Sequence, residues 1–328
     1  MKRLLAYLGL GIIGLWADSP PMQATSDAAL KGLTDAATAS EEAKGATLDG
    51  GSTIGFIPLK SPTAAKTLQQ YYQGFFRDDD TNPPTIEIPK KAQQLLGRMN
   101  DFKASGATHL IAIYHDTVEE EEYVRLLLIG NFTPAAYERL EAAGLGHRGE
   151  NNSFNIISFK DGQEIEDTSK LPPLPVLRLT QMAGRLASES DCAVDIVPLA
   201  RKDAIQSYEE ALKEAFAEDG QLPQNAVVPA RARQLEQTFG NLKSFGATHV
   251  IVTAFQNAKG ADIVLVVANG NFSAESQAEA KKLYNLKITS ETTLVMGRWV
   301  DGEDTIVPAP VQTTPKVVVP ERERRPRK

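Results

Sequence analysis

Residues 102–111 read FKASGATHLI, and residues 242–251 read LKSFGATHVI. The two segments lie 140 positions apart and share six of their ten residues, four of them in the run Gly-Ala-Thr-His. A glycine after a helical pattern is typical of a helix end, and an apolar run after it is typical of a buried strand. The repeated segment therefore predicts a helix that ends at Gly106 or Gly246 and leads directly into a strand.

The same offset relates other parts of the chain. Gly130-Asn131-Phe132-Thr133 matches Gly270-Asn271-Phe272-Ser273, and Asp161-Gly162 matches Asp301-Gly302. Aligning positions 51–170 with the positions 140 residues later gives 22 identities in 120 without a gap. A period of this length indicates two domains side by side rather than a solenoid of small units. We therefore predict an internal duplication.

Each copy is expected to run β-α-α-β-β-α-β along the chain. Apolar runs bounded by turn residues predict its strands, and apolar residues at helical spacing predict its helices. This order matches a ferredoxin-like, split βαβ unit with a doubled first helix. The expected fold class is therefore α+β, with two tandem ferredoxin-like domains related by the duplication. In the first copy the expected strands are 53–59, 109–114, 123–129 and 153–159, and the expected helices are 64–77, 90–104 and a short helix ending near 143.

The chain begins with a pattern typical of exported proteins. Lys2 and Arg3 precede an apolar run of 14 residues, 4–17. A helix of that length is too short for a hydrocarbon core about 30 Å thick, so the pattern predicts a secretory signal peptide and export to the periplasm or medium. The alternative is a membrane anchor formed by an uncleaved signal. The full division predicted is 1–17 signal peptide, 18–50 low-complexity linker, 51–165 first repeat, 166–190 Pro-rich linker, 191–307 second repeat and 308–328 disordered basic tail.

Charge is distributed unevenly along the chain. The formal net charge of −7 separates into +2 before position 18, −13 over 18–315 and +4 over 316–328. The acidic body argues against nucleic-acid binding. Cys192 is the single cysteine and therefore forms no internal disulfide, and with only four histidines the chain offers little material for a zinc site. We expect Cys192 to be a buried small apolar residue, and we expect no metal and no cofactor.

Two histidines occupy equivalent positions in the copies. His109 and His249 both follow the helix-ending glycine and begin an apolar strand. They are the candidates for a paired surface site, as ligands across a pseudo-symmetric domain contact or as a shared general base. The alternative is that each ring packs at a sheet edge, because folding alone explains a Thr-His pair at such a junction.

A second set of candidates belongs to the first copy alone. His115 and Asp116 suggest an acid–base pair, but Phe255 and Gln256 stand at the equivalent positions. Together with His147 they form the candidate site of a hydrolase acting in the cleft between the copies. No serine or cysteine nucleophile motif accompanies them.

The GATH-type helix end and the strand ending Gly-Asn-Phe before a capped helix resemble those of exported bacterial proteins of a planctomycete-like type. These proteins have unknown function and consist of a signal peptide followed by divergent copies of an α+β unit. The resemblance covers residues 51–308 and implies a tandem α+β fold and export. It implies no catalytic residue and no ligand.

The sequence does not specify a biochemical activity. Duplicated folding motifs without a catalytic constellation favour an exported, non-enzymatic binding or structural protein of the cell envelope, whose partner is an unknown protein or envelope component. The membrane is expected as a partner only through an uncleaved signal. Strand patterns that are apolar on both faces predict that the open sheet faces pack on each other or on a partner. The alternatives are a hydrolase or a small-molecule-binding protein with its site in the cleft.

Overall fold

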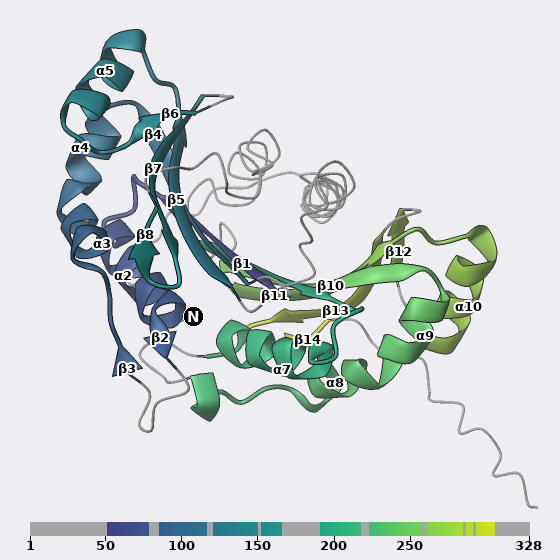
Figure 1. Cartoon of the computed structure of the whole chain (residues 1–328). Helices are drawn as coiled ribbons and strands as arrows, with labels where there is room; N and C mark the ends of the chain where they lie inside the picture. Colours follow the sequence, from purple (N-terminus) through teal and green to yellow (C-terminus); the bar gives the residue numbers. More distant parts are fainter. Residues whose placement is uncertain are drawn as a thin grey trace, which may run out of the picture.

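The computed structural model has a mixed α+β fold built on one large antiparallel sheet (Figure 1). The predicted signal peptide, both linkers and the basic tail lie outside the residues that the structure describes. The described residues are 51–78, 85–116, 121–149, 152–165, 191–217, 223–256, 260–284, 287–290 and 293–305.

Each half of the sheet has four main strands that pair antiparallel in chain order. Shorter strands pair at the outer edges, and one two-stranded ribbon lies outside the sheet. The main strands are β1 (Ser52–Pro58), β4 (Ala107–Asp116), β5 (Glu122–Gly130) and β7 (Ser153–Lys160) in the first half, and β9 (Cys192–Pro198), β10 (Ala247–Gln256), β11 (Asp262–Gly270) and β13 (Thr293–Val300) in the second. The short strands are β6 (His147–Arg148), β8 (Gln163–Glu164), β12 (Lys287–Ser290) and β14 (Glu303–Asp304), and the ribbon is β2 (Arg77–Asp78) with β3 (Thr85–Ile86).

The strand order corrects the ferredoxin-like prediction. In a split βαβ unit another strand separates the two strands that the first crossover joins. Here β1 and β4 are direct neighbours, with Ile54 opposite Ile113, and the order in the half is β1-β4-β5-β7. The order of elements along the chain agrees with the prediction, but the pairing does not. Apolar periodicity shows which face of a strand is buried and does not show which strand lies beside it.

The two halves join through strand edges. β1 and β9 pair antiparallel, with Phe56 opposite Cys192, and this seam makes one 12-stranded sheet of the two halves. The expectation that two open sheet faces pack on each other is therefore wrong. Cys192 lies at the seam with none of its surface exposed, as predicted.

The helices of both halves cover the same face of the sheet (Figure 1). The expected second helix of each half is interrupted by a 3-10 turn, so it forms three short segments. The helical segments of the first half are α2 (Ala64–Phe75), α3 (Lys90–Leu95), η1 (Leu96–Arg98), α4 (Met99–Ala104) and α5 (Pro134–Ala142). Those of the second half are α7 (Ala204–Ala215), η3 (Pro223–Asn225), α8 (Ala230–Gln234), η4 (Leu235–Thr238), α9 (Phe239–Ser244) and α10 (Ala274–Tyr284).

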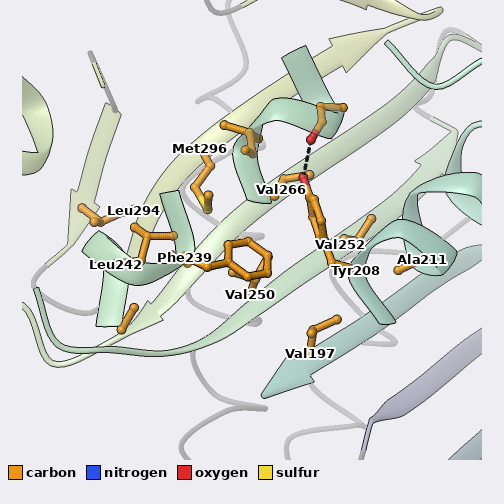
Figure 2. Close-up of a cluster of buried hydrophobic side chains, with 14 of the residues drawn as sticks. Val197, Tyr208, Ala211, Phe239, Leu242, Val250, Val252, Val266, Leu294 and Met296 are labelled. Atoms are coloured by element: carbon orange, nitrogen blue, oxygen red, sulfur yellow. Dashed lines mark hydrogen bonds between the residues drawn. The ribbon is translucent and has the colours of Figure 1, made fainter. Parts of the chain in front are cut away.

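Each half has its own core between helices and sheet. In the second half Phe239, Val250 and Met296 pack together, and the buried Tyr208 hydroxyl donates to the Ala232 carbonyl at 2.8 Å (Figure 2). The opposite face of the sheet carries a third buried cluster that spans the seam and contains, among others, Ile54, Phe56, Val194 and Ile196. Strand residues are therefore buried on both faces, which explains their nearly continuous apolar runs.

The helix-to-strand junctions form as predicted. Gly106 and Gly246 have φ of +97° and +101°, a conformation that glycine adopts without steric cost. A Cβ at Gly130 would overlap with the backbone of Gly106 and Ala107, so glycine is required there by close approach rather than by a bend. Thr133 then caps α5, because its Oγ1 accepts from Ala136 N at 3.2 Å.

Among the described helices none is both long enough and apolar enough to cross a membrane.

Candidate functional site

A large polar cavity opens on the helix-covered face of the sheet beside the seam. Its volume is about 1120 Å³, and its walls come from both halves. They comprise the ends of β1, β4 and β5, the turn after β7, the C-terminal end of α2, the middle of β9 and one side of α7. Nine carboxylate side chains and two arginines line it, which makes its lining strongly negative. The charged lining residues are Arg77, Asp78, Glu87, Asp116, Glu122, Asp161, Asp195, Arg201, Asp203, Glu210 and Glu214.

Asp195 lies at the floor of this seam cavity. It stands in the middle of β9 with 7% of its surface exposed, directly opposite Thr53 of β1. The Thr53 hydroxyl donates to Asp195 Oδ1 at 2.6 Å, so this hydrogen bond joins the halves. A carboxylate in the centre of a sheet is costly to bury unless it is hydrogen-bonded, and Thr53 provides one such bond.

The first half has different residues at the equivalent positions. Gly55 and Tyr71 stand 140 residues before Asp195 and Ala211, and the Tyr71 ring lies so close to Gly55 that any Cβ there would overlap with it. Tyr71 Oη also reaches the Cys192 carbonyl at 3.4 Å. In the second half a carboxylate replaces the glycine and a methyl group replaces the phenol. The helix therefore supplies no ring over Asp195, and Ala211 lines the cavity instead.

Arg201 forms the principal ion pairs at the cavity wall. Its guanidinium holds Asp203 through two bonds of 2.6 and 2.7 Å and reaches across the seam to Asp116 Oδ2 at 2.8 Å. These bonds raise the pKa of Arg201, the Asp203 contact most, and lower the pKa of Asp203. Arg201 is therefore engaged with Asp203 and Asp116 and neutralises part of this wall. The floor at Asp195 and the α7 side keep their negative charges.

The side of the cavity formed by the first half contains a carboxylate that holds its proton more tightly than usual. Partial burial raises the pKa of Glu122, and the neighbouring carboxylates of Asp161, Asp116 and Asp78 raise it further, against an opposing hydrogen bond from Tyr114. Burial also raises the pKa of Tyr114. A bound cation near Glu122 would relieve this repulsion, since an opposite charge favours the ionised carboxylate.

The carboxylates of the cavity lie on several of its walls rather than at one point. No group of three or more metal-ligating side chains occurs within the described residues. Separate carboxylates suit a ligand that carries several ammonium or guanidinium groups.

The two paired-site candidates lie far apart. His109 on β4 lies opposite Pro58 of β1, and His249 on β10 lies opposite Pro198 of β9. The two histidines are therefore three strand spacings and eight residues apart, or about 30 Å in a flat sheet. Each is 8% exposed, and each ring Nδ1 lies within 3.0 Å of the preceding threonine hydroxyl. The structure does not bring them together, and they form no shared site within one chain.

The three residues of the candidate hydrolase site are also separated. His115 and Asp116 are consecutive in β4 and therefore point to opposite faces of the sheet. Asp116 lines the seam cavity, whereas His115 lies on the other face. His147 is exposed on β6, three strands from β4 and about 20 Å from His115 by the strand register. These three residues therefore cannot act together as an acid–base set.

His115 is a buried polar residue in a largely apolar face. It is 5% exposed, stacks on the Tyr123 ring at 5.8 Å between centroids, and its Nδ1 lies 3.4 Å from the Ser52 hydroxyl. Burial, with a smaller contribution from the Arg125 charge, lowers its pKa to about 4. His115 is therefore neutral at physiological pH.

Reasoning from the sequence identified Asp116 but not Asp195, Arg201, Thr53 or Ala211. One signal in the sequence was available: the two copies differ in chemical character at matched positions, where Gly55 and Tyr71 become Asp195 and Ala211. Searching for residues that the copies share favours the folding motifs, whereas the cavity consists largely of residues that they do not share.

Comparisons with protein-family models, with curated proteins and with solved structures found no match.

Proposed function

We propose that the protein is an exported, non-enzymatic binding protein whose seam cavity takes an elongated ligand bearing ammonium or guanidinium groups. The observation that carries the proposal is the cavity of about 1120 Å³ lined by nine carboxylates and two arginines. This volume is slightly above the roughly 300–1,000 Å³ usual for small-molecule sites, and the charge of the lining favours cations.

The position of the cavity supports the proposal. Its floor at Asp195 and Thr53 lies on two paired strands in the middle of the sheet, which hold it rigidly. Rigid elements place binding groups more precisely than loops do. One side wall of the cavity is formed by α7, which presents Glu210 and Glu214 on one helix face, four residues apart. A ligand between floor and helix would contact carboxylates on both sides.

Two further inferences accompany the proposal. We infer that the halves arose by duplication, because both carry a register shift at the same strand position, between Ala107 and His109 and between Ala247 and His249. We also propose export, as the N-terminal pattern and the resemblance to exported bacterial proteins imply. Mass spectrometry of the secreted or periplasmic protein tests export, and a mature N-terminus at Asp18 is the expected result.

Equilibrium titration tests the binding proposal. Fluorescein-labelled tetralysine is titrated with the purified protein at low ionic strength and followed by fluorescence anisotropy, with labelled tetraglutamate as the probe of opposite charge. We expect saturable binding of tetralysine, no binding of tetraglutamate, and weaker tetralysine binding as salt is added. Equal binding of both peptides, or no saturable binding of tetralysine, would overturn the proposal.

A double variant locates the binding site. Glu210→Gln with Glu214→Gln removes two negative charges from the α7 wall. Glu210 is exposed and Glu214 is half-buried, and glutamine keeps the size and shape of both side chains. We expect tetralysine affinity to fall at least tenfold, with the thermal unfolding midpoint unchanged. A matched variant carries Glu209→Gln and Glu138→Gln, two exposed residues outside the cavity lining. It should bind as the wild type does, and an equal loss in both variants would mean that binding is non-specific.

A further inference from the structure

We propose that the basic segment 316–328 of the same chain occupies the seam cavity and competes with the external ligand. This inference rests on the proposed function, because it assigns an occupant to the same site. The segment reads KVVVPERERRPRK and carries six positive and two negative charges. It therefore has the chemistry that the cavity lining favours.

Charge complementarity favours this pairing over other positions of the segment. The body from 18 to 315 has a net charge of −13, and the seam cavity gathers nine of its carboxylates around one space. Four arginines, at 322, 324, 325 and 327, stand within six residues. A guanidinium group can form two parallel hydrogen bonds with a carboxylate, so closely spaced arginines suit a lining rich in carboxylates.

The stretch of chain after Thr305 is long enough for the basic segment to reach the seam cavity. Thr305, the last described residue, donates its backbone N–H to the Arg298 carbonyl. The row of paired residues that includes Arg298 runs through Leu265, Thr253 and Val194 to Ile54, beside the cavity floor. Thr305 therefore lies five strand spacings from Ile54, about 24 Å in a flat sheet. The direct line runs through buried strands, so the chain must pass around the helices. The sixteen residues 306–321 span at most about 53–58 Å, which allows Arg322 to reach the cavity by that longer path.

Attachment to the body makes weak contacts sufficient. A tethered segment is present at its site at an effective concentration of the order of millimolar. A free cationic ligand with a dissociation constant near micromolar would still bind, but with reduced apparent affinity. The segment would therefore set the threshold concentration at which the external ligand enters.

The experiment compares the full chain with a variant ending at Pro315 and with a full-length variant carrying Arg322→Gln, Arg324→Gln, Arg325→Gln and Arg327→Gln. Labelled tetralysine is the probe. We expect both variants to bind tetralysine about tenfold more tightly than the full chain. Equal affinity for all three proteins would overturn the inference while leaving the proposed function intact.

A second measurement separates the two proposals. A synthetic peptide of residues 316–328 is titrated into the truncated protein, with and without Glu210→Gln and Glu214→Gln. We expect saturable peptide binding that displaces tetralysine and that weakens in the double variant. If tetralysine binds the truncated protein and the peptide does not, the inference fails alone. If neither binds, both proposals fail.

Discussion

Replacing His115 with phenylalanine, the residue at the equivalent position 255, should remove one component of the protein's loss of stability in acid. The neutral imidazole is buried against Tyr123, with Arg125 nearby, and its pKa is lowered to about 4. In the unfolded chain a histidine titrates near 6.5. Between these values the unfolded state binds a proton that the folded state does not, so acid favours unfolding.

The sign and size of this pH effect follow from the coupling between protonation and folding. A group with a lowered pKa in the folded state contributes full stability above pH 6.5 and loses it as pH falls toward 4. With the two values of 6.5 and about 4, the expected loss between pH 8 and pH 5 is about 2 kcal/mol from His115 alone. His115→Phe should lack this component, whatever its effect on stability at pH 8.

Urea unfolding at pH 8, 7, 6 and 5, followed by circular dichroism, measures the effect. The quantity compared is the change in unfolding free energy between pH 8 and pH 5 in the wild type, His115→Phe and His147→Gln, whose histidine is exposed on β6. We expect a flatter profile only for His115→Phe. Profiles of equal slope in the wild type and His115→Phe would refute the argument that burial keeps this histidine neutral.

Other predictions concern buried hydroxyls and required glycines. Tyr208→Phe should lower the unfolding free energy by about 1 kcal/mol, because its hydroxyl donates a buried hydrogen bond. Tyr72→Phe should be neutral or stabilising, since the buried Tyr72 hydroxyl has no partner among the described residues; urea denaturation compares the two. Gly130→Ala should cost about 2 kcal/mol or more, since its Cβ would overlap with the neighbouring backbone. Gly240→Ala, in an open position in α9, should instead stabilise by about 0.5 kcal/mol in thermal unfolding. A larger loss of stability in Tyr72→Phe than in Tyr208→Phe, or in Gly240→Ala than in Gly130→Ala, would contradict these assignments.

The helix-to-strand junctions were predictable because their causes are local. The left-handed conformations of Gly106 and Gly246 and the cap at Thr133 depend on a few consecutive residues, so they leave a signal in the sequence. The interruption of the second helix by η1 was not predicted. Its apolar spacing continues through 90–104, and local spacing alone does not distinguish a regular helix from one with a tight 3-10 turn.

The seam was not predictable for a different reason. The edge pairing of β1 with β9 depends on which strand edges are left free, and the side-chain pattern of a strand contains no such information. The site follows from the seam: Thr53 and Asp195 are 142 residues apart in sequence and become partners only when these two edges meet. Asp116 was identified from its neighbour His115, yet its actual partner is Arg201 from the other half.

The most direct test of the account is the affinity of labelled tetralysine for Asp195→Asn compared with Asp101→Asn. Each variant removes one negative charge, but Asp195 lies at the cavity floor, whereas Asp101 is exposed on α4, paired with Arg98 and outside the cavity lining. Asparagine keeps an oxygen that can accept the Thr53 hydrogen bond. We predict that Asp195→Asn weakens binding about tenfold, or 1.4 kcal/mol, and that Asp101→Asn leaves it unchanged. Equal affinities for the two variants would contradict the claim that the seam cavity is the binding site.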